Sequence, residues 1–263
     1  MLTTLLSLLL IFAQTQSPEL ARQPNNSGVY VVAHRGAHEG IPENTLAAYR
    51  RAIELGADFV EIDVRETKDG HLVSVHNESV DDYAKGTTGL VKDFTLAELK
   101  ALDIGSRVGP EWANERIPTF EEILEVCKGK IGVYLDLKQA SVNKILEVAR
   151  RFEMTRDIVW YAGTPQLRQV REQCSECLLM PEVGAGENLS RTVRLFTPKV
   201  VASTWKQLSA QTVKACHEAG VVLIVDDGGP SSWDDMLSLG VDGIQTDNVA
   251  ALIERLKQRE SAR

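Results

Sequence analysis

The sequence predicts an α/β protein built as a single (β/α)₈ TIM barrel, and three observations favour this fold. Apolar, β-branched runs alternate with helical patterns from residue 29 onward, which is typical of parallel sheets. A length of 263 residues suits one barrel domain. The sequence contains no glycine motif of the dinucleotide-binding or P-loop type. That third observation disfavours the competing doubly wound open sheet.

The first residues differ in character from the rest. Residues 5–13 form an apolar run that is too short to cross a bilayer and resembles the core of a secretory signal peptide, although no Lys or Arg precedes it. We expect a signal peptide at 1–17, a polar linker at 18–28 and one domain at 29–263. The signal predicts export, periplasmic or extracellular, with tethering by an uncleaved segment as the alternative.

The net charge and the cysteine content limit the kinds of partner and of covalent bridge to expect. A net charge of -8 repels the phosphate backbone of nucleic acids and disfavours nucleic-acid binding. We expect a small-molecule phosphodiester as the partner and no integral membrane span in the mature chain. Of the four cysteines, Cys127 and Cys216 lie on helical patterns and are expected to be buried thiols. A bridge between Cys174 and Cys177 is open if the protein is exported.

Each element follows from a local pattern, taken in chain order. A buried strand at 30–33 precedes a helix that Asn44 or Thr45 caps and Gly56 ends. Thr119 and Glu122 form a capping box, and Pro165 suits a first helical turn. The later strands are expected at 59–64, 72–76, 131–137, 158–161, 178–180, 200–202, 221–225 and 243–245. The later helices are expected at 96–102, 119–127 and 142–152, from 165, and around 192, 213, 236 and 252.

An Asp-Gly turn at Asp69 and Gly70 predicts a hairpin extension after the second strand. If these are the two loop residues, Lys68 pairs with His71, and Asp63 lies opposite His76. The second of the two expected arms, 72–76, then returns antiparallel, and eight strands remain for the barrel. The same register brings a carboxylate and a histidine together.

Polar residues collect where the expected strands end, which is the functional end of such a barrel. His34 and Arg35 end the first strand, Glu61 and Asp63 share one face of the second, and Asp136 and Lys138 share one face of a later strand. Carboxylates in apolar strands are costly unless they are paired or bind a metal. We therefore expect Glu61, Asp63 and Asp136 to hold one divalent cation, Mg²⁺ or Ca²⁺.

The remaining polar groups indicate proton transfer on a phosphoryl group. His34 and His76 are an acid and a base near that cation, while Arg35 and Lys138 would balance charge on phosphoryl oxygens. Asp247 follows the last strand and is expected to cap the last helix. The other histidines are expected at the surface; they are His38, His71 and His217.

Several motifs, in order, resemble the glycerophosphodiester phosphodiesterase family, a phosphatidylinositol phospholipase C-like barrel. The resemblance extends from about residue 31 to residue 252. The motifs are His34-Arg35-Gly36, Pro42-Glu43-Asn44-Thr45, Glu61-Ile62-Asp63-Val64, Val75-His76, Asp136-Leu137-Lys138 and Gly240-Val241-Asp242-Gly243-Ile244-Gln245-Thr246-Asp247.

This resemblance implies a metal-dependent barrel that cleaves glycerophosphodiesters to glycerol 3-phosphate and an alcohol. It implies that His34 acts first as a base on a glycerol hydroxyl and His76 as an acid, with hydrolysis of a cyclic phosphate following. It assigns metal binding to Glu61, Asp63 and Asp136. It assigns phosphate contact to Arg35 and Lys138, and a supporting position behind the first strand end to Glu43.

The sequence also departs from the family pattern. Asp136 stands where the family usually has Glu, and Asn77 where it usually has Asp. Residues 224–227, ending in Asp226 and Asp227, replace a Trp-Thr-Val-Asn pattern that lies by the substrate. Two alternatives therefore stay open. One is a related phosphodiesterase that acts on a lysophospholipid or another phosphodiester, and the other is a catalytically silent barrel that binds phosphodiesters.

Overall fold

Eight parallel strands form a nearly closed barrel in the computed structural model, which describes residues 20, 22–184 and 189–262. The strands pair in the order β6-β5-β4-β2-β1-β9-β8-β7, and a parallel bridge between Glu182 and Ala202 joins the β6 side to β7. The predicted barrel is confirmed. The strands are β1 (Tyr30–Ala33), β2 (Phe59–Glu66), β4 (Gly132–Gln139), β5 (Ile158–Tyr161), β6 (Leu178–Met180), β7 (Val200–Thr204), β8 (Val222–Asp226) and β9 (Gly243–Thr246).

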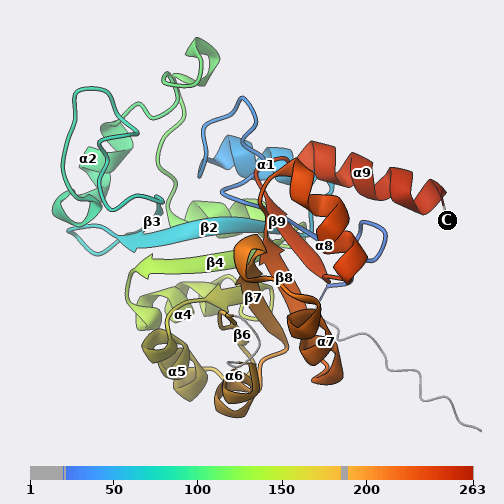
Figure 1. The fold of residues 1–263 in the computed structure, drawn as a ribbon. Helices are drawn as coiled ribbons and strands as arrows, with labels where there is room; N and C mark the ends of the chain where they lie inside the picture. Colours follow the sequence, from blue (N-terminus) through green and yellow to red (C-terminus); the bar gives the residue numbers. More distant parts are fainter. Residues whose placement is uncertain (1–19, 21, 185–188, 263) are drawn as a thin grey trace, which may run out of the picture.

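Helices follow the strands and cover the outside of the barrel (Figure 1). Thr45 caps the first, and Thr95 and Thr119 each form a capping box with a Glu three residues on. The α-helices are α1 (Leu46–Leu55), α2 (Leu96–Ala101), α3 (Phe120–Cys127), α4 (Val142–Arg151), α5 (Thr164–Gln173), α6 (Leu189–Phe196), α7 (Ala210–Glu218), α8 (Trp233–Leu239) and α9 (Val249–Ser261). Short 3₁₀ turns cover η1 (Val91–Asp93), η2 (Pro110–Trp112), η3 (Trp205–Gln207) and η4 (Pro230–Ser232).

Strand side chains alternate between two apolar layers because the period of a strand is two. The outward layer packs against the helices, as Val31 and Leu223 do. The inward layer fills the lumen and includes Tyr30, Val32 and Ile224. Leu20 joins this inward cluster next to the first residues of several strands, so it lies at the N-terminal end of the barrel. The opposite, C-terminal end is therefore the one left open to a ligand.

The chain returns after β2 as the antiparallel strand β3 (Leu72–Ser74). Its register differs by one residue from the expected one. Val64 pairs with Ser74, and the Val75 N–H donates to the Asp63 carbonyl, so Asp63 lies opposite Val75 and not His76. The expected pairing of Lys68 with His71 is wrong, since the Thr67 N–H donates to the carbonyl of His71.

The described residues before β1 bind the barrel. Asn25 and Asn26 hydrogen-bond to Asp58, and the Tyr30 hydroxyl donates to the carbonyl of Arg22. Ser27 donates to Glu260 at the far end of α9. The expected signal peptide, 1–17, lies outside the described residues. Among those that are described, no helix has the length and apolar content needed to span a membrane.

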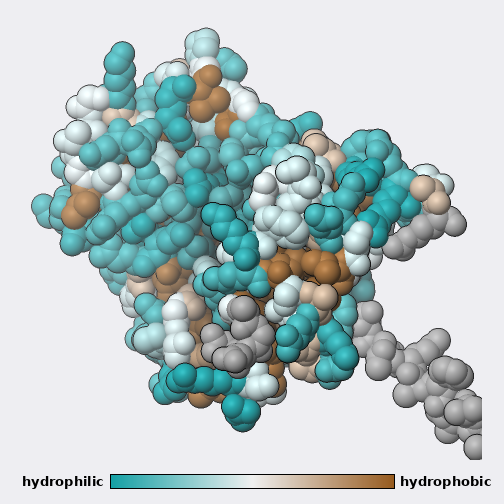
Figure 2. Space-filling view, in the orientation of Figure 1, coloured by the Kyte–Doolittle hydropathy of each residue, from teal (hydrophilic) through white to brown (hydrophobic). Residues whose placement is uncertain are grey.

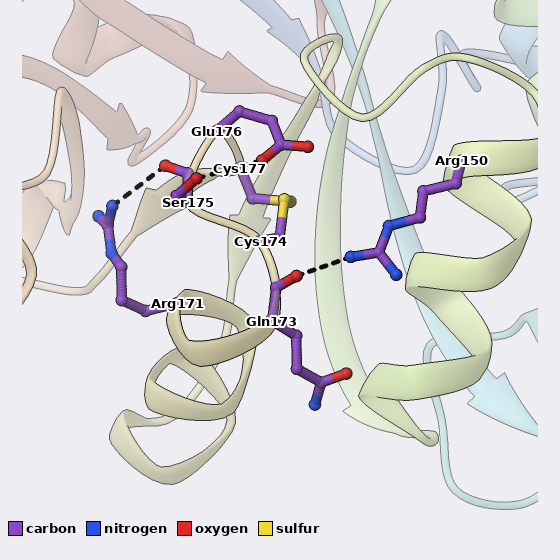
Figure 3. The surroundings of a disulfide bond; sticks show 7 residues. All are labelled: Arg150, Arg171, Gln173, Cys174, Ser175, Glu176 and Cys177. Carbon is purple, nitrogen blue, oxygen red and sulfur yellow. Dashed lines mark hydrogen bonds between the residues drawn. A yellow bond between two sulfur atoms is a disulfide. The ribbon is translucent and has the colours of Figure 1, made fainter.

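A disulfide joins Cys174 and Cys177 between α5 and β6 (Figure 3). Arg150 of α4 donates to the carbonyl of Gln173, and Arg171 donates to that of Ser175, so cations from two helices hold the loop. Cys127 and Cys216 are buried free thiols, as expected. The face of the molecule seen in Figure 2 is mostly hydrophilic, with only small hydrophobic areas.

Candidate active site

A cavity of about 240 Å³ opens at the C-terminal end of the barrel. Six of the residues expected at the site line it: His34, Arg35, Glu61, His76, Asp136 and Lys138. Asp63 lies directly behind them, in contact with Arg35 and Lys138. Residues up to 104 positions apart therefore converge on one hollow, because they lie on strands of the same barrel or in the turns just after them.

Three carboxylates form a compact cluster at the wall of this cavity. Glu61, Asp63 and Asp136 each place an oxygen within 4.8 Å of the others. The ladder pairs Asp63 with Asp136, which puts both side chains on the inner face. Burial, then the charges of Asp63 and Asp136, raise the pKa of Glu61 well above its usual value. Excess negative charge in a buried, oxygen-rich cluster suits a hard divalent cation.

Lys138 supplies positive charge to this cluster through a bulge in β4. The β2–β4 pairing passes from Leu137 to Gln139, so Lys138 is the extra residue. Bulges of this kind re-aim a side chain next to an active site. Its Nζ lies 2.6 Å from Asp136 and 3.2 Å from Asp63. Burial lowers the pKa of Lys138, but the two carboxylates outweigh burial and raise it overall.

Arg35 lies in a sharp turn after β1. Its φ is 53°, in the left-handed region, and Gly36 follows with a φ of 84°. This turn lets the Arg35 N–H donate to Glu61 at 2.7 Å. The guanidinium lies 3.3 Å from Glu43 and 3.8 Å from Asp63. Burial lowers the pKa of Arg35, yet the acids around it, Glu43 first, raise that pKa overall, so Arg35 stays a cation.

Glu43 lies behind the end of β1, where its carboxylate contacts the guanidinium of Arg35. It also accepts a hydrogen bond from the hydroxyl of Tyr83. Burial first, and the hydrogen bond and charge of Glu43 among the other causes, raise the pKa of Tyr83 to about 12. The phenol therefore stays a donor throughout the physiological range. Its oxygen accepts in turn from the Asn77 N–H, which connects Glu43 to the residue after His76.

Asn44 has a role that sequence reasoning missed. Thr45, not Asn44, caps α1. Asn44 instead has a φ of 54° and donates from Nδ2 to Asp63 at 2.7 Å. Its Oδ1 accepts from Tyr49 and Ser74, both of which are buried. The Asn in the Pro-Glu-Asn-Thr motif thus orients a carboxylate of the acid cluster.

His34 and a second histidine share one carboxylate. His34 Nδ1 lies 2.7 Å and His38 Nε2 3.0 Å from Asp247 Oδ1. These two hydrogen bonds hold the pKa of Asp247 well below its usual value. The expectation that Asp247 caps the last helix is wrong, since Asn248 occupies the N-cap of α9 without a side-chain bond. His38 is half-buried against Asp247 and is not an isolated surface histidine.

His76 reaches the cavity from the turn after β3. Its Nδ1 lies 2.9 Å from Asn77 Oδ1, while the Asn77 amide nitrogen donates to Asp82. Arg65 of β2 donates to the carbonyls of Val75 and His76 and so anchors this backbone. His76 therefore faces the same cavity as His34 although the hairpin register differs from the expected one.

Other inward-facing residues complete the cavity, and of those named next only Asp226 had been placed near the substrate from the sequence. Tyr161 donates to Glu182 at 3.0 Å, and Gln245 donates to Asp226 at 3.2 Å. The signal for them was the alternation of each strand, which places its last residues on the inner face. Asp227 is different, since it turns away and accepts from the indole of Trp233.

Comparisons with a family model, with the sequences of relatives and with solved structures all point to the same family. The family model described as "Glycerophosphoryl diester phosphodiesterase family" matches residues 34–164. A glycerophosphodiester phosphodiesterase of Caldanaerobacter subterraneus subsp. tengcongensis is 35% identical over 241 residues, which cover 87% of this chain and 98% of that protein. The chain belongs to the glycerophosphodiester phosphodiesterase family. It is therefore a phosphoric diester hydrolase.

Solved structures of glycerophosphodiester phosphodiesterases have the same fold. That of Agrobacterium tumefaciens superposes with a TM-score of 0.77 at 27% identity, covering 86% of this chain and 99% of that chain. A phosphodiesterase of Oleispira antarctica, solved with the product sn-glycerol-3-phosphate, gives 0.80 at 26% identity, covering 87% and 96%. The barrel is thus a shared family architecture.

Proposed function

We propose that this chain hydrolyses glycerophosphodiesters to glycerol 3-phosphate and an alcohol by acid–base catalysis at His34 and His76. The observation that supports this most is the convergence of two imidazoles, two cations and three carboxylates on one cavity. Relatives with this activity in their names cover nearly the whole barrel, and one solved relative holds glycerol 3-phosphate.

Glu61, Asp63 and Asp136 would hold one divalent cation, Mg²⁺ or Ca²⁺. The residues fit such an ion, because burial raises the pKa of both Glu61 and Asp136 and the cluster carries more negative charge than Lys138 offsets. Carboxylate oxygens alone are the donor set of hard cations. When bound, the ion would supply Lewis-acid stabilisation of charge on the phosphoryl oxygens.

His34 would act as the base. Asp247 is a carboxylate and can only accept, so the proton of His34 lies on Nδ1 and leaves Nε2 free. Nε2 would take the proton of a glycerol hydroxyl as its oxygen attacks phosphorus. The bond from phosphorus to the alcohol oxygen breaks, and a cyclic phosphate forms.

His76 would act as the acid. Asn77 Oδ1 accepts from its Nδ1–H, and Nε2 would give a proton to the departing alcohol oxygen. Water would then open the cyclic phosphate with the two histidines in exchanged roles. Arg35 and Lys138 would contact the phosphoryl oxygens, since both stay cationic at the cavity wall.

A lysophospholipid is the second candidate substrate, favoured by one observation. A further cavity of about 420 Å³ adjoins the first and shares Asp136, Tyr161 and Glu182 with it. Its lining includes apolar residues, of which Leu195 is 42% exposed and available to an acyl chain.

A substrate panel tests this function. The full chain is incubated with glycerophosphodiesters and lysophospholipids in Mg²⁺ or Ca²⁺, with and without EDTA, and the products are measured: glycerol 3-phosphate from the former and lysophosphatidic acid from the latter. We expect metal-dependent release from the glycerophosphodiesters. No turnover of any panel member with either ion would refute the proposal and favour a silent binding barrel. Retained metal binding in a Glu61→Gln, Asp63→Asn double variant would refute the cation site.

We infer export for this chain from the apolar run at residues 5–13. An exported enzyme would meet phosphodiesters outside the cytoplasm. Fractionation of cells expressing the full chain, against a variant carrying Leu8→Arg and Leu9→Arg, tests this. Equal distribution of both proteins between fractions would contradict export.

A further inference from the structure

Three inward-facing side chains at the ends of β7, β8 and β9 are not used by the proposed chemistry. They are Thr204, Asp226 and Gln245, called here the acceptor wall. Thr204 pairs with Asp226, and Asp226 pairs with Gln245, so the three residues lie side by side across the ends of the strands. The neighbouring strands β7, β8 and β9 are seen in Figure 1. All three line the cavity that also holds His34 and the acid cluster.

Gln245 indicates that this wall is built to accept hydrogen bonds. The residue is 7% exposed, and its Nε2 donates to Asp226 at 3.2 Å. That bond fixes the orientation of the amide and leaves Oε1, which has no hydrogen-bond partner among the described residues. A buried carbonyl oxygen without a donor is costly, so a ligand that brings a donor is favoured there.

The opposite side of the cavity has the reverse chemistry. Arg35 and Lys138 are donors and cations, and they suit the phosphoryl oxygens. The acceptor wall offers a carboxylate, an amide oxygen and a hydroxyl, which suit a group rich in O–H donors. A phosphodiester of glycerol carries both kinds of group, since its phosphoryl oxygens accept and its free hydroxyls donate.

We propose that the acceptor wall, through the unpaired Oε1 of Gln245, binds the free terminal hydroxyl of the substrate's glycerol moiety. This inference rests on the proposed function. The proposed mechanism requires a glycerol hydroxyl to lie at His34, which follows β1. Strand β9 runs directly beside β1, with Gln245 paired to Val32. The phosphoryl group would lie against Arg35 and Lys138, so the terminal hydroxyl on the next carbon would extend away from them, toward the wall formed by β8 and β9.

A matched pair of substrates tests the role of the wall. One is a glycerophosphodiester, and the other has propane-1,2-diol in place of glycerol. The second keeps the hydroxyl that attacks phosphorus and lacks only the terminal hydroxyl. We expect kcat/KM to fall about tenfold or more, which is typical of a lost buried hydrogen bond to a charged group. If neither substrate is cleaved, the proposed function fails; if both are cleaved equally, this inference alone fails.

Variants of the acceptor wall test which of its residues recognises the terminal hydroxyl. Gln245→Met keeps a similar volume without the amide, and the ratio of kcat/KM between the two substrates should fall to within about threefold of one. Thr204→Val, which is nearly isosteric, should reduce the same ratio by less. Gln258→Met on the exposed face of α9 is the matched control and should keep the wild-type ratio. A folded Gln245→Met protein, checked by its melting curve, that kept the full ratio would overturn the inference.

Discussion

Asp247 joins two imidazoles through a single carboxylate oxygen. Because that oxygen accepts from His34 Nδ1, the other ring nitrogen, Nε2, is the one left to act as the proposed base. His38 adds a second donor to the same oxygen and limits how far Asp247 can rotate. At the scale of the residue, the proposed base thus depends on His38 and Asp247, two residues that are more than 200 positions apart from each other in the chain.

Asp247→Asn should lower kcat by about 100-fold, because an amide can donate to Nδ1 and favour the wrong tautomer. The same variant has a pH signature. The lowered pKa of Asp247 stabilises the fold above the usual carboxyl pKa, and this stability is lost as pH falls toward the lowered value. The exposed carboxylate limits the effect to about 1 kcal/mol.

Urea unfolding at several pH values measures this difference. The gap between wild type and Asp247→Asn should be full near neutral pH and shrink below about pH 4. A gap that grew as the pH fell would contradict the assignment.

His76→Ala should lose activity in proportion to the basicity of the leaving alcohol. With an alkyl alcohol, kcat should fall about 10³-fold, since no group protonates the departing oxygen. With a p-nitrophenyl ester, whose leaving oxygen needs no proton, the fall should be much smaller. Steady-state kinetics on both esters check this. Equal losses on the two would mean that His76 positions the substrate and does not act as the acid.

The turn after β1 is the element that delivers both His34 and Arg35. Gly36 has a φ of 84°, and a Cβ there would lie 2.7 Å from Cβ of Ala48 in α1. The turn therefore depends on the absence of a side chain, which lets α1 pack against the strand end. This close approach also allows the Arg35 N–H to reach Glu61.

Gly36→Ala should destabilise the fold by about 3 kcal/mol, through left-handed strain and overlap with α1. Gly40→Ala is the matched control. Its φ is 72°, but nothing lies within 4 Å of an added Cβ, so the cost should be about 1 kcal/mol from strain alone. Urea unfolding of the two variants gives both numbers. Equal costs would show that α1 can move away.

The hairpin after β2 shows where the sequence was misleading at the scale of an element. Asp-Gly indicates a two-residue loop, but Thr67 bonds to Asp69 with its side chain and to His71 with its backbone, so the loop is longer. The register shifts by one residue as a result. His76 still reaches the cavity because Arg65 holds its carbonyl, a contact that no local pattern predicts.

For the whole molecule, the barrel and the acid cluster followed from the sequence because both depend on strand alternation. Glu61, Asp63 and Asp136 could be placed on inner faces from their spacing alone. The pairing of His38 and His34 with Asp247 could not, since it depends on how far the barrel closes. The orientation of Gln245 was hidden for the same reason, because its partner Asp226 lies on another strand.

Metal should stabilise the folded barrel as well as support catalysis. An ion at 100 times its dissociation constant adds about 2.7 kcal/mol, which raises the melting temperature of a chain of this length by roughly 5–10 °C. Calorimetry with Mg²⁺ or Ca²⁺ against EDTA measures the shift. The Glu61→Gln, Asp63→Asn double variant should lose it, whereas Glu153→Gln, at an exposed ion pair, should keep it. A shift that survived in the double variant would place the ion elsewhere.

Leu20 in the lumen limits how the gene can be cut for recombinant work. A chain started at Ser27 would lose Leu20, the carbonyl of Arg22 that Tyr30 binds, and the Asn25 and Asn26 contacts to Asp58. Water would then reach the apolar floor of the barrel. An affinity tag therefore belongs after α9, and a shortened expression clone should begin no later than Pro18.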